Sequence, residues 1–220
     1  MKKMIAIAVL SVFLAGGLFA SFTPANAATR DNHLETALAE IPKASLSEAE
    51  KKGLLLMREE EKLARDLYLA LYDKWGTRAF SNIAKSEQHH MDSIKILLDR
   101  YGLADPVGSD RRGKFSDPAL QKAYDDLLKQ GLVSRAEAAK VGAMVEEMDI
   151  RDLREAIALT DNKDLKLVYA NLEKGSRNHL RAFGKQISKE NVRYTATYLG
   201  QAEAEKIMKS PHERDEITDI

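Results

Sequence analysis

Residues 77–101 read TRAFSNIAKSEQHHMDSIKILLDRY and give the clearest indication of the fold. Its apolar residues recur every three to four positions, which is the spacing of one face of an α-helix. Glu87 and His90 lie on that same face, one turn apart, with apolar residues on both sides. The stretch therefore predicts a helix that carries a carboxylate and an imidazole into the protein core.

On either side of this segment, three further long helices are predicted over residues 47–75, 134–159 and 161–188. The first two begin at capping boxes, SEAE at 47–50 and SRAE at 134–137. Asp161 is the expected N-cap of the last helix, and Asp149 or Asp152 is a point where the 134–159 helix would be interrupted. Good helix formers (Ala, Leu, Lys and Glu) dominate the composition, so an all-α domain is expected.

A long connection over residues 102–133 separates the two helix pairs. It starts as a loop, and Asp117-Pro118 then predicts the start of a short helix that ends near Gly131. One long crossover between the second and third helices is the ferritin-like connectivity. We therefore expect a ferritin-like four-helix bundle over residues 47–190, with a crossover that carries a short helix.

The ends of the chain are expected to lie outside this bundle. Residues 1–27 have the pattern of a cleaved signal peptide: Lys2 and Lys3, an apolar run too short to span a membrane, and the cleavage site Ala25-Asn26-Ala27. A polar lead-in over residues 28–46 and a polar tail over 191–220 are expected to flank the bundle. The protein is thus expected to be exported, to periplasm or medium, without membrane association after cleavage.

The composition excludes several classes of protein. Without residues 1–27 the chain has 193 residues, with 32 basic and 34 acidic side chains. A nucleic-acid binder needs a concentrated excess of positive charge, so that class is excluded. The absence of cysteine excludes disulfides, thiolate metal sites and a cysteine nucleophile. The oligomeric state stays open, dimerisation included.

Each of the four long helices places a metal-ligand side chain in the middle of its apolar face. Glu61, Glu146 and His179 occupy this position in the other three helices, beside Glu87 and His90. A buried carboxylate costs several kcal/mol unless it is paired or coordinated. Two divalent cations would neutralise three carboxylates and accept two imidazoles. The pattern predicts a di-metal centre, with iron first and manganese or zinc as alternatives.

Other interpretations of these polar residues stay open. The set is also compatible with a buried salt-bridge network that includes Arg65, Arg177 and Arg181. Glu60, Glu147 or Asp149 are alternative ligands in place of one of the carboxylates above.

Two groups of charged residues are nevertheless expected on solvated faces. Glu59 and Glu60 are expected there with Lys62, and Glu147 is expected on the polar side of its helix with Lys140 and Arg151.

Three runs, MREEEKLARD at 57–66, SEQHHMD at 86–92 and GSRNHL at 175–180, resemble domain of unknown function 2202, an exported branch of the ferritin-like superfamily. The resemblance covers about residues 47–190. It implies a four-helix bundle that binds iron or a similar metal, and it brings no established activity. The chain departs from the ferritin pattern at Ser176, where a glutamate normally precedes the last histidine by one turn. This departure would leave metal positions open to water, oxygen or peroxide.

Three functions follow as hypotheses. The first is a di-iron-type oxidoreductase that oxidises Fe(II) or reduces peroxide, in which Tyr68, near Glu61, has a catalytic role. The second is a non-catalytic protein of metal handling. The third is a helical interaction module whose buried charges are structural.

Overall fold

The computed structural model describes residues 33–214 and 217 of the chain. All regular secondary structure in this described part is α-helical, which confirms the all-α prediction. The predicted signal peptide lies outside the described residues. None of the helices between residues 33 and 214 combines the length and apolar character that crossing a membrane requires.

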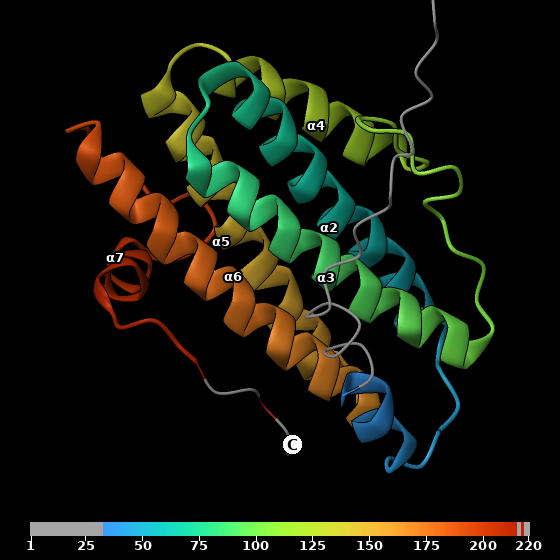
Figure 1. Ribbon diagram of the computed structural model, residues 1–220. Helices are drawn as coiled ribbons and strands as arrows, with labels where there is room; N and C mark the ends of the chain where they lie inside the picture. The colour runs from blue at the N-terminus through green and yellow to red at the C-terminus, as the bar shows by residue number, and fades with distance from the viewer. Residues whose placement is uncertain (1–32, 215–216, 218–220) are drawn as a thin grey trace, which may run out of the picture.

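Four long helices run side by side (Figure 1). They are α2 (Glu48–Trp75), α3 (Arg78–Tyr101), α5 (Arg135–Leu159) and α6 (Lys163–Lys189). Helix α2 packs along α3, and α5 packs along α6; contacts of α3 with α6 and of α2 with α5 join the two pairs. Two shorter helices, α4 (Pro118–Gly131) in the crossover and α7 (Gln201–Lys209) near the C-terminus, pack on their outer sides.

The helix ends follow local sequence, with one correction. Ser47 starts α2 through a complete capping box. Gly76 and Gly102 end α2 and α3 in the left-handed conformation, with φ of 65° and 67°, which glycine adopts without strain. The N-cap of α6 is Asn162, so the prediction of Asp161 was wrong by one residue. Helix α5 is continuous through both aspartates where an interruption was considered.

A buried polar layer divides the apolar core into two halves. One half contains Leu63, Phe80 and Phe183, and the other contains Leu54 and Ile94. Between these halves, halfway along the four long helices, all of the polar residues that the apolar stripes contained are buried: Glu61, Glu87, His90, Glu146, Ser176 and His179. The helical periodicity therefore located the inward face of each helix correctly.

The solvated face predicted for α2 is wrong, because the crossover covers it. Glu59, Glu60 and Lys62 are all buried. The carboxylate of Glu59 accepts hydrogen bonds from the backbone N–H groups of Ser116 and Asp117. Lys62 donates to Asp66 and to the carbonyl oxygen of Arg111. These buried charges hold the crossover against α2.

The predicted polar side of α5 is likewise covered. Glu147 is fully buried, and its Oε2 atom accepts hydrogen bonds of 2.8–2.9 Å from the backbone N–H groups of Thr197, Tyr198 and Leu199. The segment between α6 and α7 is thus anchored on α5. At the other end of the chain, residues 33–39 are helical and Leu38 is buried in the apolar core.

Candidate metal centre

Two histidines and three carboxylates meet in the polar layer. Glu87 lies at the centre, with its Oε2 atom 2.8 Å from Nδ1 of His90 and its Oε1 atom 2.9 Å from Nδ1 of His179. Glu61 Oε2 lies 3.1 Å from the same atom of His90, and Glu146 Oε2 lies 3.3 Å from that of His179. The structure therefore brings together all five residues that the sequence singled out, from four different helices.

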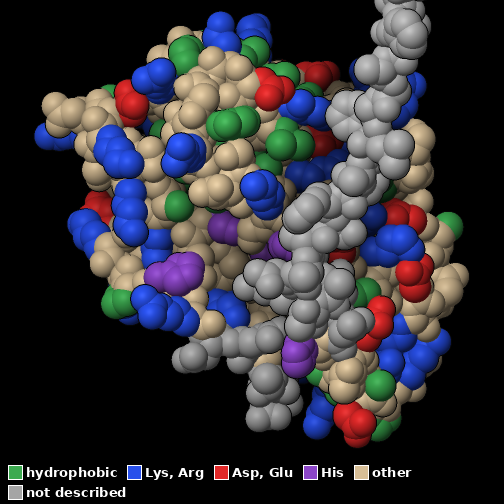
Figure 2. Space-filling view, viewed as in Figure 1, with side chains coloured by type: hydrophobic (Ala, Val, Ile, Leu, Met, Phe, Trp, Pro, Cys, Tyr) green, Lys and Arg blue, Asp and Glu red, His purple; other side chains and the backbone are tan. Residues whose placement is uncertain are grey.

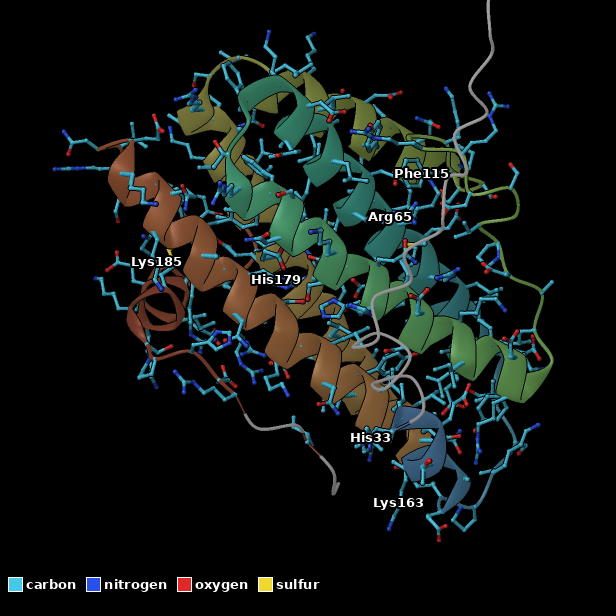
Figure 3. All side chains as sticks on the ribbon, in the orientation of Figure 1. His33, Arg65, Phe115, Lys163, His179 and Lys185 are labelled. Atoms are coloured by element: carbon cyan, nitrogen blue, oxygen red, sulfur yellow. The ribbon has the colours of Figure 1, made fainter. Side chains whose placement is uncertain are left out.

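The five residues form two similar units, each with one imidazole between two carboxylates. The imidazole of His90 lies between Glu61 and Glu87, and that of His179 lies between Glu87 and Glu146. The two rings are stacked, with centroids 5.3 Å apart. Glu87 is common to both units, so the cluster offers two adjacent sets of oxygen and nitrogen ligands with one shared carboxylate. Figure 3 shows His179 between α6 and α3, in the interior of the molecule.

The electrostatics of the cluster follow from burial and from these contacts. Burial opposes charge on Glu87, but the two facing imidazoles outweigh it and lower the pKa of that carboxyl. Burial also opposes charge on His90, yet Glu61 and Glu87 raise the pKa of the imidazole to about 10. Burial and repulsion from Glu87 raise the pKa of Glu146 to about 7. In the metal-free protein, protons on the two imidazoles therefore offset part of the charge of the three buried carboxylates.

Several oxygen atoms of this cluster form no well-aligned hydrogen bond within the described part of the chain, although those of Glu87 and Glu146 lie close to imidazole Nδ1 atoms. They are Oε1 of Glu61, both carboxylate oxygens of Glu87, and Oε2 of Glu146. A buried acceptor without a hydrogen bond costs about 1–3 kcal/mol, and more when it is charged. Such orphaned oxygens, beside two imidazole nitrogens, are the donor set that a transition-metal ion accepts.

The arginine network considered as an alternative is wrong. Arg65 binds Asp110 of the crossover, with Nη1 2.9 Å from Oδ2. Arg177 and Arg181 both bind Glu213 near the C-terminus. Since these three arginines are bound to carboxylates outside the cluster, none of them neutralises its buried charge. Figure 3 shows Arg65 beside Phe115 of the crossover, apart from His179.

Tyr68 is fully buried and orients one carboxylate of the cluster. Its hydroxyl donates a 2.6 Å hydrogen bond to Oε1 of Glu146, and its ring packs against those of Phe80 and Phe183. Burial, and then the charge of Glu146, raise the pKa of the phenol well above its usual value. The hydroxyl therefore stays protonated and acts as a hydrogen-bond donor that fixes Glu146.

The alternative carboxylates differ in their positions. Glu147 is held by backbone N–H groups on the outer side of α5, which removes it from the cluster. Asp149 is buried with one oxygen atom that makes no hydrogen bond to any described residue, and burial followed by repulsion from Glu61 raises its pKa. Burial and then Asp152 raise the pKa of Glu60 to about 8. Asp149 is thus an additional buried carboxylate at the edge of the cluster.

Gly175 of α6 lies against the cluster, and its neighbour Ser176 is buried. A Cβ atom at Gly175 would lie 2.4 Å from Nε2 of His90, so only glycine fits against this ring. Ser176 is 1% exposed, and its hydroxyl donates to the carbonyl oxygen of Leu172, 3.2 Å away. Position 176 therefore faces the interior one turn before His179, as the sequence indicated.

Gly175→Ala is expected to weaken metal binding about tenfold, because the added methyl group would displace the His90 ring. The same overlap is expected to lower the free energy of unfolding by about 1–3 kcal/mol. Gly53→Ala in α2 is the matched control, since a Cβ atom there meets nothing within 4 Å. Its expected effect is a stabilisation of about 0.5–1 kcal/mol with unchanged metal affinity. Metal titration and thermal melts measure both quantities; equal behaviour of the two variants would contradict the placement of His90.

Known proteins are similar to this chain in sequence and in fold. The family described as "Uncharacterized protein domain (DUF2202)" matches residues 50–211. The uncharacterized protein MJ0754 of Methanocaldococcus jannaschii is 50% identical over 177 residues, which cover 80% of this chain and 96% of that protein. The crystal structure of the hypothetical protein MJ0754 from Methanococcus jannaschii has a TM-score of 0.77 and 50% identity, and the match covers 79% of this chain and 99% of that one.

Proposed function

The chain belongs to the DUF2202 domain family, and we propose that it is a ferritin-like four-helix bundle whose core binds two transition-metal ions. The single long crossover between α3 and α5 supports the ferritin-like connectivity. Iron is the first candidate, with manganese and zinc as alternatives, because carboxylate and imidazole ligands suit all three.

One observation carries this proposal: Glu87 is shared between two buried histidines, and each histidine has a further carboxylate on its other side. In this proposal Glu61, Glu87 and His90 hold one ion, and Glu87, Glu146 and His179 hold the other. A structural ion-pair network would satisfy its buried oxygens with well-aligned hydrogen bonds, whereas Oε1 of Glu61 and both carboxylate oxygens of Glu87 have none within the described residues.

Redox-active ions bound by these residues would supply electron transfer to or from oxygen, peroxide or Fe(II). Residues around the ligands orient one of them and exclude water from the site. Tyr68 fixes the orientation of Glu146 through its hydrogen bond, and the two apolar halves of the core exclude water on either side of the layer. With Ser176 in place of a glutamate, the five protein ligands would leave coordination positions of the two ions open.

The decisive test is the metal content of the chain after loading with Fe(II) without oxygen, or with Mn(II). We expect about two ions per chain, and a rise in melting temperature that depends on metal concentration. Elemental analysis and thermal melts measure these. A folded protein that takes up less than about 0.2 ion per chain would contradict the proposal.

Activity separates an oxidoreductase from a metal-handling protein without turnover. An oxidoreductase consumes oxygen or peroxide over many cycles, whereas a storage or transfer protein reacts once per bound ion. We further propose that the protein acts after export, since its N-terminal sequence has the pattern of a cleaved signal peptide.

A further inference from the structure

A groove of about 580 Å³ connects the polar layer with the surface. It lies between α3 and α6 and extends to the chain that follows α7. His90 and His179 form part of its lining, and their side chains are 10% and 9% exposed. In Figure 2, histidine side chains show in this hollow beside Lys and Arg side chains. A small molecule in the groove would therefore meet the two histidines of the candidate metal centre.

The lining of the groove is cationic. Apart from its histidines, the charged side chains of the lining are four cations and one carboxylate: Lys174, Arg181, Lys185, Arg214 and Glu213. The carboxylate is already committed, because Arg177 and Arg181 bind it and lower its pKa to about 2. Lys185 and Arg214 form no ion pair with any residue that the structure describes.

Neutral hydrogen-bonding groups complete the lining. Asn82, Ser86 and Ser93 contribute amide and hydroxyl groups from α3, and Asn178 contributes an amide from α6. His89 contributes an imidazole whose Nδ1 atom is buried without a hydrogen bond to a described residue. Ammonium, guanidinium, amide and hydroxyl donors together are the groups that bind the oxygen atoms of an anion.

We propose that this groove is a binding site for a small oxyanion, with a carboxylate or phosphate group, and that it leads the anion to His90 and His179. Charge complementarity concentrates such an anion at the mouth of the groove. Its delivery to a metal ion rests on the proposed function; its binding in the groove does not. Two bound divalent cations would change the net charge beneath the groove from negative to positive, so metal and anion should each tighten the binding of the other.

The test starts with the metal-free chain. Sulfate and acetate are the probes, added at constant ionic strength against sodium chloride, and glycerol is the neutral control. Amide chemical shifts are followed by nuclear magnetic resonance. Both anions are expected to shift residues of α3 and α6 that line the groove, with saturation, and to leave α4 unchanged; sulfate stands for phosphate and acetate for a carboxylate. A response to neither anion, or an equal response to glycerol, would overturn the proposal.

Charge reversal then tests the location of the site. The double variant Lys185→Glu, Arg214→Glu is expected to weaken sulfate binding about tenfold. Each substitution replaces a cation that attracts sulfate by a carboxylate that repels it. Lys129→Glu on α4 is the matched control, because Lys129 is exposed and lies outside the groove. It removes the same kind of charge and is expected to change the sulfate affinity by less than about twofold. Equal weakening by both variants would show non-specific attraction and refute the site.

Metal loading separates this inference from the proposed function. If both hold, the affinity for sulfate rises about tenfold in the Mn(II)-loaded chain, and sulfate raises the affinity for Mn(II) equally. A chain that takes up no metal but binds sulfate through Lys185 and Arg214 refutes the proposed function and supports the groove. A chain that binds metal but no anion supports the proposed function and refutes the groove.

Discussion

Glu87→Gln is expected to weaken metal binding about 100-fold or more, because it removes the carboxylate that both candidate metal positions share. The metal-dependent rise in melting temperature should disappear with it. The metal-free protein is also expected to lose about 3–5 kcal/mol in free energy of unfolding, since His90 and His179 lose the buried charge that faces both imidazoles. Metal titration and denaturant unfolding of the same preparation measure the two effects.

Glu59→Gln is the matched control for this variant. Glu59 is also a buried glutamate in a long helix, but its carboxylate binds backbone N–H groups of the crossover. Its replacement is expected to lower stability by about 1–3 kcal/mol and to leave metal affinity unchanged. Wild-type metal affinity in Glu87→Gln would remove the observation on which the proposed function rests, whatever the loss of stability.

Ser176→Glu is expected to shift the metal-free and metal-loaded proteins in opposite directions. The new carboxylate would enter the polar layer beside His179, where repulsion from the other buried carboxylates lowers the free energy of unfolding by about 1–3 kcal/mol. In the loaded protein it would serve as a ligand, so metal affinity should rise and reaction with oxygen or peroxide should fall. Thermal melts with and without Mn(II) compare the two states.

Ser188→Glu provides the comparison for this experiment. Its hydroxyl bonds the carbonyl oxygen one turn back, as that of Ser176 does on the same helix, but Ser188 is exposed. The change is expected to stay within about 0.5 kcal/mol in both states. If Ser176→Glu also left the stability of both states unchanged, position 176 would not face the cluster. The assignment of His179 as a ligand would then be refuted as well.

The interior of this protein was predictable from its sequence because helical periodicity reports which side of a helix faces inward. Glu61, Glu87, His90, Glu146 and His179 interrupt apolar stripes at similar depth in their helices, and four helices packed side by side bring similar depths together. The periodicity does not determine distances between side chains. The sharing of Glu87 by two histidines and the hydrogen bond of Tyr68 became visible only in the structure.

The outer faces were not predictable in the same way. Glu59, Lys62 and Glu147 have charged neighbours in the sequence, and a single helix with one apolar stripe leaves such residues in water. The crossover covers α2, and the segment after α6 covers α5, through contacts between residues about 50 positions apart. Local pattern contains no information on such contacts. The length of the 102–133 connection was the one available hint that it packs on the bundle.

The division of the core into two apolar halves bears on when the protein would acquire the proposed metal ions. Each half contains residues of all four long helices, so hydrophobic packing holds both ends of the helices together whatever occupies the layer between them. Folding would then precede the proposed metal loading, and an ion would enter or leave a structure that is already assembled. The fraction of occupied metal positions would then depend on the metal concentration around the folded protein. It would not depend on the metal concentration during folding.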